Sequence, residues 1–395
     1  MLIRQHAITM VRMRVKHRSC VIFFCSSAGE YEQARPLIDR LLAREQPPHI
    51  HVFFFSRSGI EFMHARRETI AHSLAPIDTV WHWGTLFAAL QPDACIVVRH
   101  EWWPGFLATA REYAKVCLID GTRSPGTTLF KRSMKARLAG FFDRIFVVGP
   151  DDADWFSREL GITRARLAVV GDTKYDRARD RVLSNPNLIS SLATDLERVF
   201  PERYRLVAGS VHTPDVAALC AAFRKLDAST SKKWLLVLVP HEVSQGKTQE
   251  ILAQVRSAGL RIVRMSQLAD ESGPISAEVL LVDRMGILAE LYGVARLGYI
   301  GGAMHHKVHN VLEAAAHGLA AACGPYYKNS AEAVRLVGEG MLKVVTDADR
   351  LTNWWQENAS RTSQPGQSAE RVAALCGATA LIIPELDTVM RKSPT

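Results

Sequence analysis

The sequence lacks the patterns that mark several large classes of protein. No pair of its seven cysteines has the C-x-x-C spacing of zinc or redox sites, and the metalloprotease motif H-E-x-x-H is absent. No run approaches the roughly 18 apolar residues of a membrane span. The stretch 1–20 holds five basic residues and no acid, but it lacks the long apolar core of a signal peptide. The scattered cysteines indicate reduced, buried thiols in a cytoplasmic protein.

The chain does contain enough apolar sequence for a folded protein with a large core. Hydrophobic residues make up 48% and charged residues 23% of its 395 residues, which favours one large domain or two of ordinary size. The formal net charge is +9, so we expect an anionic partner. No helix-turn-helix signature and no basic strand interleaved with aromatic residues indicates nucleic acid as that partner. The basic N-terminus is either a membrane-facing arm or a frayed terminus.

Short apolar runs alternate with amphipathic segments along both halves of the chain. This alternation predicts strands joined by helices, in parallel sheets that are covered on both faces. Because it restarts after a polar, charged stretch, we expect an N-terminal acceptor-binding domain at 1–178, a linker at 179–204 and a C-terminal domain at 205–395 that ends in a helix near 368–382. The predicted class is α/β, with two doubly wound, Rossmann-like domains facing across a cleft.

Polar residues follow successive predicted strands, which is where ligands bind in sheets of this kind. Glu30, Glu101 and Lys174 take such positions in the first half, and Ser210 and His241 take them in the second. A single polar residue after a strand means little, since most strands end in polar loops. The whole series favours binding sites in both domains.

The run GYIGGAMHHKVHNVLEAAAHG, residues 298–318, predicts a strand, a glycine-rich loop and a helix. Gly301 and Gly302 would let the backbone approach a ligand, and free N–H groups at the helix start attract phosphate. His309 and Asn310 stand at that start, where Asn310 could cap the helix. Glu313 could accept hydrogen bonds from ribose hydroxyls; the alternative interpretation is a capped helix with an ion-paired glutamate. The loop is not G-x-G-x-x-G, so a dinucleotide fold is not indicated.

Two further clusters do not predict a metal site. His305, His306 and His309 have no cysteine or acid at ligand spacing. The acidic residues within 151–154 open a predicted helix, where the helix dipole favours negative charge, so a structural role is the better interpretation.

The segment from Arg123 to Arg144 carries six basic residues and one acid. Lys131, Arg132 and Lys135 share a predicted helix with apolar residues, a combination suited to the anionic headgroups of amphiphiles. A solvated helix face is the alternative. With Glu101 and Arg123, these three residues form the predicted acceptor-binding set.

Together these runs resemble the Kdo transferases, a family that moves 3-deoxy-D-manno-octulosonic acid (Kdo) from its CMP ester onto the lipid A precursor of Gram-negative bacteria. The resemblance covers about residues 20–350 in the family's order, and the joint occurrence of the pieces makes it specific. The matching pieces are SSAGEYEQARPLI, FFFSRSGIEF, EWWPGFL, VVGDTKYDR, VAGSVH, VPHE, LYGVARLGYIGG and HNVLEAAAHGLAAACGPYYKNSAEA.

The resemblance implies the GT-B glycosyltransferase fold and inversion at the sugar's anomeric carbon, with no metal or other cofactor. The family's catalytic base is the glutamate of S-x-G-E, here Glu30. A carboxylate at a strand end can take the proton of the acceptor hydroxyl, and the nearby helix N-terminus is expected to keep it ionised. Lys174 matches the basic residue of the family's G-D/N-x-K/R-x-D motif, which suits the carboxylate or phosphate of the donor. Glu313 matches the acid that contacts the ribose. The donor- or nucleotide-binding set is Lys174, Ser210, His241, Gly301, Gly302, His309, Asn310 and Glu313.

The favoured interpretation is a Kdo transferase of lipopolysaccharide core biosynthesis that acts on a lipid IVA-type acceptor. Such an enzyme would bind peripherally to the cytoplasmic face of the bacterial inner membrane, with no transmembrane span in this chain. The alternatives are a transferase for another CMP-ulosonic acid or a capsular acceptor, and a non-catalytic sugar-nucleotide-binding relative. Glu30 with Lys174 favours an enzyme. The sequence Pro240-His241-Glu242, where many members read Pro-Arg-His, favours the non-catalytic relative.

Overall fold

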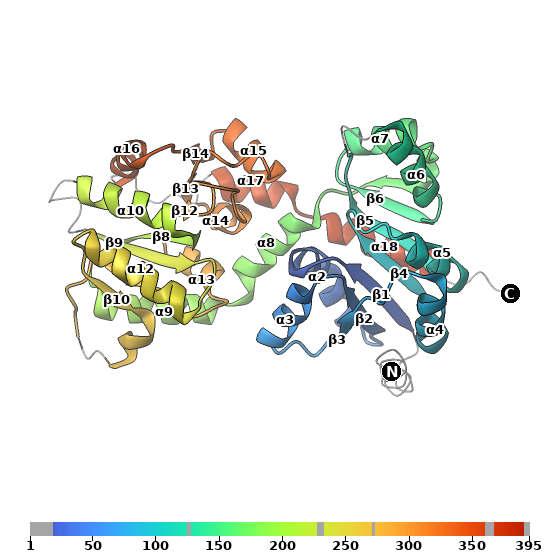
Figure 1. Cartoon of the computed structure of the whole chain (residues 1–395), viewed down its shortest axis with the longest axis horizontal. Helices are drawn as coiled ribbons and strands as arrows, with labels where there is room; N and C mark the ends of the chain where they lie inside the picture. Colours follow the sequence, from blue (N-terminus) through green and yellow to red (C-terminus); the bar gives the residue numbers. More distant parts are fainter. Residues whose placement is uncertain (1–18, 125–127, 227–232, 271–272, 360–366, 391–395) are drawn as a thin grey trace. The chain divides into compact units, whose positions relative to one another are not determined.

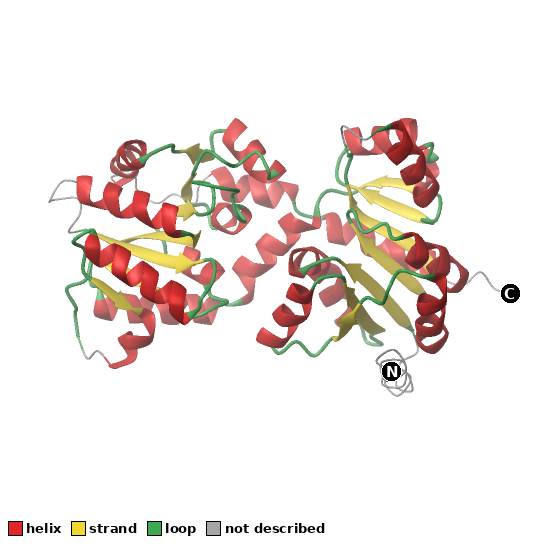
Figure 2. Cartoon of the chain, in the orientation of Figure 1, coloured by secondary structure: helices red, strands yellow, loops and turns green. Residues whose placement is uncertain are grey.

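A computed structural model describes residues 19–124, 128–226, 233–270, 273–359 and 367–390. The basic N-terminal tract discussed above lies outside these residues. The chain forms two compact units, an N-terminal unit of Met1–Arg177 with Leu375–Thr395 and a C-terminal unit of Ala178–Ala374 (Figure 1). The described part of each unit holds one parallel sheet of seven strands with helices packed around it (Figure 2). The predicted α/β class with two Rossmann-like domains is confirmed.

The sheet of the N-terminal unit has the strand order β3-β2-β1-β4-β5-β6-β7. The order reverses between β1 and β4, which pair directly. Its strands are β1 (Cys20–Cys25), β2 (His49–Phe54), β3 (Ala71–Leu74), β4 (Ala94–Val98), β5 (Lys115–Gly121), β6 (Arg144–Val147) and β7 (Leu167–Val169). Its helices are α2 (Ala28–Leu42), α3 (Arg57–Ala65), α4 (Val80–Leu90), α5 (Pro104–Tyr113), α6 (Leu129–Ala139), α7 (Pro150–Leu160), the 3-10 turn η1 (Arg164–Arg166), α18 (Ala378–Met390) and the start of α8 (Thr173–Ser184).

The strand β1 is apolar throughout because both of its faces are covered. Val21 and Phe23 pack in one buried cluster with Leu37 of α2, whereas Ile22 and Phe24 pack in another cluster on the opposite face. Successive side chains of a strand point to opposite faces, so one continuous apolar run supplies both clusters. All seven cysteines are free thiols, and all except the partly exposed Cys376 are buried, as the sequence predicts.

The sheet of the C-terminal unit has the order β10-β11-β9-β8-β12-β13-β14, and it reverses between β8 and β12. Its strands are β8 (Tyr204–Val211), β9 (Trp234–Pro240), β10 (Ile262–Arg264), β11 (Val279–Leu281), β12 (Leu297–Ile300), β13 (Ala320–Cys323) and β14 (Leu342–Val344). Its helices are α9 (Pro186–Val199), α10 (Thr213–Lys225), α12 (Gln245–Ser257), η2 (Met265–Asp270), α13 (Leu288–Gly293), α14 (Leu312–Ala316), α15 (Ala331–Gly338), α16 (Ala348–Ala359) and α17 (Gln367–Leu375).

The predicted linker at 179–204 is a helical part of the C-terminal unit. It holds the end of α8 and all of α9, which buries Leu192, Leu196 and Val199. The side-chain amide of Asn185 donates to the carboxylate of Glu290 over 2.7 Å, which fixes the start of α9 to the same unit. Polar composition suggested a connection, but one apolar stripe is enough to dock an amphipathic helix.

The predicted final helix differs from the structure in both extent and place. It is interrupted at Gly377, whose φ of +122° suits glycine, and it continues as α18. That helix packs on the N-terminal unit instead of completing the C-terminal domain, because Ile382 and Leu386 are fully buried in the cluster that includes Leu37. Glu385 also pairs with Arg144 at 2.9 Å.

The stretch Gln367–Met390, which comprises α17 and α18, is long and apolar enough to cross a membrane by length and composition. By length and composition alone, this stretch contradicts the expectation that no segment of the chain could span a membrane. They are weak evidence for a span, since the helices of a folded core satisfy them too. Only 28% of the most apolar window is buried, but the buried part includes the contacts of α18 with the N-terminal unit.

Candidate active site

Glu30 lies in the first turn of α2, directly after β1. Its Oε2 accepts a 2.5 Å hydrogen bond from the backbone N–H of Ser26, the residue that follows the strand. The neighbouring strand β4 ends beside β1 and leads to Arg99 and Glu101. Glu30 therefore stands at the point where the strand order reverses, the usual ligand site of a doubly wound sheet.

The environment of Glu30 does not keep its carboxyl group fully ionised. Burial raises its pKa to about 7, and the negative charge of Glu101 adds to the rise, whereas the hydrogen bonds from Ser26 and the charge of Arg99 lower it. The expectation that the helix N-terminus holds this group ionised is therefore wrong, because loss of hydration outweighs the favourable contacts. A carboxylate with a pKa near neutral is a stronger base than an ordinary glutamate.

A buried polar network adjoins Glu30, and the sequence interpretation missed its members. Arg99 donates to Gln33 and to Asp172, each over 2.6 Å. Asp120, fully buried near the end of β5, accepts from the backbone and the hydroxyl of Thr173. Burial and the nearby charge of Asp172 raise the pKa of Asp120. Arg99 and Asp120 come at the ends of apolar runs, and this position is the sequence signal that could have found them. Their positive φ values of 54° and 52° cannot be predicted from the sequence.

Lys174 follows this network in the first turn of α8. Its backbone N–H donates to Oδ1 of Asp172 over 2.9 Å, so the carboxylate that pairs with Arg99 also fixes the start of the helix. Asp176, the last acid of the same motif, accepts from the backbone of Gly377 and Thr379. One end of this motif thus anchors Lys174, and the other end anchors α18.

The predicted basic face of α6 is not a uniform solvated surface. Lys131 is exposed, but Arg132 is paired with Glu159. Nζ of Lys135 donates to Ser124 over 2.7 Å and lies 5.6 Å from the ring centre of Trp102, and burial lowers the pKa of Lys135. The three basic residues of α6 in the predicted acceptor set thus differ. Lys131 is exposed, Arg132 is paired, and Lys135 is held over an aromatic ring.

The two remaining acceptor candidates have partners of their own. Oε2 of Glu101 accepts from the indole of Trp103 over 2.8 Å. The guanidinium of Arg123 lies 3.5 Å from Asp151, and its backbone N–H donates to Asp152. Asp152 also accepts from the N–H of Gly149 at the start of α7, which confirms the structural role predicted for residues 151–154.

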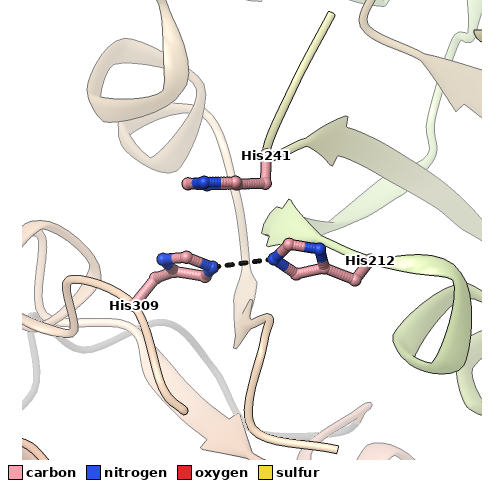
Figure 3. A group of neighbouring side chains, drawn as sticks. All are labelled: His212, His241 and His309. Atoms are coloured by element: carbon pink, nitrogen blue, oxygen red, sulfur yellow. Dashed lines mark hydrogen bonds between the residues drawn. The ribbon is translucent and has the colours of Figure 1, made fainter. Parts of the chain in front are cut away.

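In the C-terminal unit, three histidines gather where β8, β9 and β12 end (Figure 3). His212 begins α10, His241 follows β9, and His309 lies in the loop after β12. The Nε2 atoms of His212 and His309 are 3.0 Å apart, and the ring of His241 stacks on that of His309 with centres 4.2 Å apart. Among the described residues, His212, His241 and His309 therefore form a group that could hold a metal ion.

Buried Asp215 fixes the backbone around the three histidines. Its Oδ2 accepts from the backbone N–H of His212 and of Gly302, each over 2.9 Å, and its Oδ1 accepts from the hydroxyl of Tyr299. The carboxylate thus joins the start of α10 to the loop that carries His309. Ser210, predicted on the nucleotide side, stands two residues before His212 with a φ of +54°.

The glycines of the loop serve the chain's own packing. A side chain on Gly301 would meet the backbone of Ser210 at 2.4 Å, and one on Gly302 would meet the carbonyl of Lys307 at 2.3 Å. The N–H of Gly302 is also taken by Asp215. The chain's own packing is thus one reason for these two glycines, and their role in the approach of a ligand stays a prediction.

Asn310 and Glu313 stand around a shorter helix than the sequence predicts. The helix α14 has five residues and begins at Leu312, whose N–H donates to the side chain of Asn310 over 3.0 Å. Asn310 therefore serves the helix start as predicted. Glu313 is half-buried in the first turn, and its charge adds to the burial that raises the pKa of Tyr292.

Comparison with known proteins shows which family the chain resembles. The family described as 3-Deoxy-D-manno-octulosonic-acid transferase (kdotransferase) matches residues 4–177. The 3-deoxy-D-manno-octulosonic acid transferase of Haemophilus influenzae is 26% identical over 341 residues, which cover 84% of this chain and 77% of that protein. The transferase of the same name from Aquifex aeolicus is 25% identical over 304 residues, covering 76% and 74%.

A solved structure supports the fold independently of these sequences. UDP-GlcNAc 2-epimerase from Neisseria meningitidis, bound to UDP-GlcNAc, aligns with a TM-score of 0.59 over 93% of this chain and all of that chain, at 13% identity. The fold is that of the GT-B glycosyltransferases and their epimerase relatives.

The class of protein is therefore that of the glycosyltransferases. Within that class, residues 4–177 match the Kdo transferase family, and transferases of that name are similar over most of the chain.

Proposed function

We propose that the protein transfers Kdo from CMP-Kdo to a hydroxyl of a phosphorylated lipid A precursor, with inversion at the anomeric carbon. The observation that carries the proposal is Glu30, a half-buried carboxyl with a pKa of about 7 at the switch point of the N-terminal sheet. The family that residues 4–177 match suggests the reaction class.

In this reaction Glu30 acts as the general base. The acceptor hydroxyl attacks the anomeric carbon, its proton passes to Glu30, and the bond between that carbon and the phosphate oxygen breaks as CMP leaves. The base removes the proton while the new bond forms, which avoids a positively charged oxygen in the transition state. The hydrogen bond from Ser26 holds the carboxylate in place for this role.

The donor side of the reaction falls to the C-terminal unit and Lys174. Glu313, in the first turn of α14, accepts from the ribose hydroxyls, and His309 and Asn310 lie next to it in the chain. Lys174 meets the charge of the donor's carboxylate or phosphate as CMP departs, so the reaction needs no metal ion.

The acceptor carries phosphates, and we assign Lys131 and Lys135 to their recognition. Lys135 is held by Ser124 and Trp102 and so offers a cation that loses little side-chain entropy on binding. Exposed Lys131 and the apolar Phe130, which is 78% exposed, suit a peripheral place at the inner membrane's cytoplasmic face.

The proposed role of Glu30 predicts an acidic limb in the pH profile. Because only the ionised carboxylate accepts a proton, kcat/KM should fall about tenfold for each pH unit below the Glu30 pKa of about 7 and level off above it. Steady-state rates from pH 5 to 9 measure this limb. A limb centred near the ordinary glutamate pKa of about 4.3 would contradict the burial-driven shift.

The proposed ribose contact predicts that CMP stabilises the protein in a way that depends on Glu313. A ligand that binds only the folded state at 100 times its Kd adds about 2.7 kcal/mol to the free energy of unfolding. Thermal unfolding with and without CMP should show this gain in the parent and a smaller gain in Glu313→Ala. The matched control is Glu357→Ala, an exposed acid of α16. Equal stabilisation of the parent and Glu313→Ala would rule out the ribose contact.

Mass spectrometry of the lipid product tests the whole function. The protein is incubated with CMP-Kdo and a lipid IVA-type acceptor, and the lipid should gain the mass of at least one Kdo unit. In parallel reactions other CMP-ulosonic acids replace the donor. Transfer from one of these and not from CMP-Kdo would favour the related transferase, whereas CMP binding without any transfer would favour a non-catalytic relative.

A further inference from the structure

Three imidazole rings meet in the C-terminal unit. His212, His241 and His309 come from three separate segments, and one ring nitrogen of each lies within 4.8 Å of the others (Figure 3). Their backbones are pinned, since the N–H of His241 donates to Val211 and that of His309 donates to Gly301. The rigid ends of the sheet therefore hold the three side chains together.

One of the three nitrogen–nitrogen distances, that of the hydrogen bond between His212 and His309, is close to that of a metal site. Two nitrogen ligands about 2.0–2.1 Å from a tetrahedral ion lie about 3.3 Å apart, and the Nε2 atoms of His212 and His309 are 3.0 Å apart. The ring of His241 is tilted only 20° from that of His309, so its lone pair does not yet converge on the same point. His241 is exposed, so its side chain is free to rotate toward that point, at the cost of its stacking on His309.

The electrostatics keep the three rings in the form that binds metals. Burial lowers the pKa of His309 to about 4, and the other two histidines and Lys307 add to the shift. Burial also lowers the pKa values of His212 and His241, although the charge of Glu242 opposes the shift of His241. Asp215 opposes the shift of His212 but is itself committed to three hydrogen bonds, while Lys307 and Lys247 are exposed cations whose charge water screens.

We propose that His212, His241 and His309 form a binding site for one transition-metal ion of the Zn²⁺, Co²⁺ or Ni²⁺ class. Imidazole nitrogen is the ligand these ions favour, and three protein ligands leave the fourth position to water. Hard ions such as Mg²⁺, which require oxygen ligands, do not fit this set.

The ion regulates the donor site, a consequence that rests on the proposed function. Ring nitrogens that bind an ion cannot donate hydrogen bonds to a phosphate. Since His241 and His309 belong to the proposed donor-binding set and transfer needs no metal, an ion in this site competes with CMP. The enzyme would then be inhibited by the ion and released by a chelator.

Cobalt titration tests the site without any nucleotide. Chelator-treated protein carrying Cys376→Ser, which removes the thiol that is not buried, is titrated with Co²⁺ while visible absorption is recorded. One tetrahedral Co²⁺ per chain is expected. Replacing His212, His241 or His309 by alanine should each weaken binding at least about tenfold, the lower end of what loss of an outer-shell partner costs. Exposed His306→Ala is the matched control and should bind like the parent.

Each result bears on one part of the proposal. His241→Ala changes an exposed residue, so it tests the site even if the more buried positions prove necessary for folding. Absence of tetrahedral Co²⁺, or equal affinity in His241→Ala and the parent, would overturn the site. With the site occupied, the apparent Kd for CMP should rise in proportion to Co²⁺; an unchanged or tighter Kd would overturn the competition. Failure of CMP to bind the metal-free protein would refute the proposed function and leave the metal result standing.

Discussion

Replacing Glu30 by glutamine is expected to lower the turnover number by about 10²–10⁴, the usual contribution of a general base. The amide has the shape of the carboxyl group and can still accept the hydrogen bond from Ser26, so the local structure should persist. It cannot accept the proton of the acceptor hydroxyl at any pH of the assay. The acidic limb near pH 7 should therefore disappear together with the rate.

The measurement is single-turnover transfer by the Glu30→Gln variant, with CMP binding followed separately by calorimetry. CMP affinity should stay within a factor of about two, since Glu30 has no role in nucleotide recognition. The control is Glu61→Gln, which makes the same chemical change at an exposed position of α3. Turnover of Glu30→Gln close to that of this control would remove Glu30 from the mechanism.

Replacing Leu386 by alanine is expected to reduce the free energy of unfolding by about 2–5 kcal/mol, as deletion of a buried leucine side chain does. Leu386 of α18 is fully buried in the cluster shared with Leu37 and Ile38 of α2. The substitution removes apolar contacts and leaves a cavity in the N-terminal unit. Urea unfolding followed by circular dichroism measures the loss.

The same helix provides a matched control for this prediction. Leu381 is 56% exposed, so Leu381→Ala should change the stability of the protein by no more than about 0.5 kcal/mol. If both substitutions had equal small effects, α18 would not contribute to the core of the N-terminal unit. If both were strongly destabilising, the effect would belong to the helix itself and not to the buried contact.

The βα alternation predicted the class of the fold because it is a local property of the sequence. Runs such as Val21–Phe24 are apolar throughout since helices cover both faces of the sheet. This pattern can be recognised in the sequence of the strand alone. The sequence does not predict which of the two units α18 packs on. An amphipathic helix shows which face is apolar, but not which of two similar apolar surfaces it will cover.

In the candidate site too, local sequence motifs predict some residues, whereas contacts between distant segments cannot be predicted. Short motifs predict Glu30, Lys174 and Glu313 as site residues, whereas Arg99 and Asp172 form an ion pair across 73 positions of sequence. The shift of the Glu30 pKa could not be read either, because it depends on how far neighbouring residues exclude water. The convergence of His212 with His241 and His309 depends on three strand ends that meet only in the fold, so spacing along the sequence groups His305 and His306 with His309 instead.

The return of α18 has a consequence for how the protein is made on the ribosome. Residues 1–177 leave the exit tunnel first, but the face of α2 that Ile382 and Leu386 cover stays bare until almost the whole chain has been translated. The C-terminal unit can fold in the meantime, since its residues are contiguous. The first unit to be synthesised is thus the last to be completed, and while it waits it exposes an apolar surface of the kind that chaperones bind. A stop codon before α18 would leave that surface bare for good.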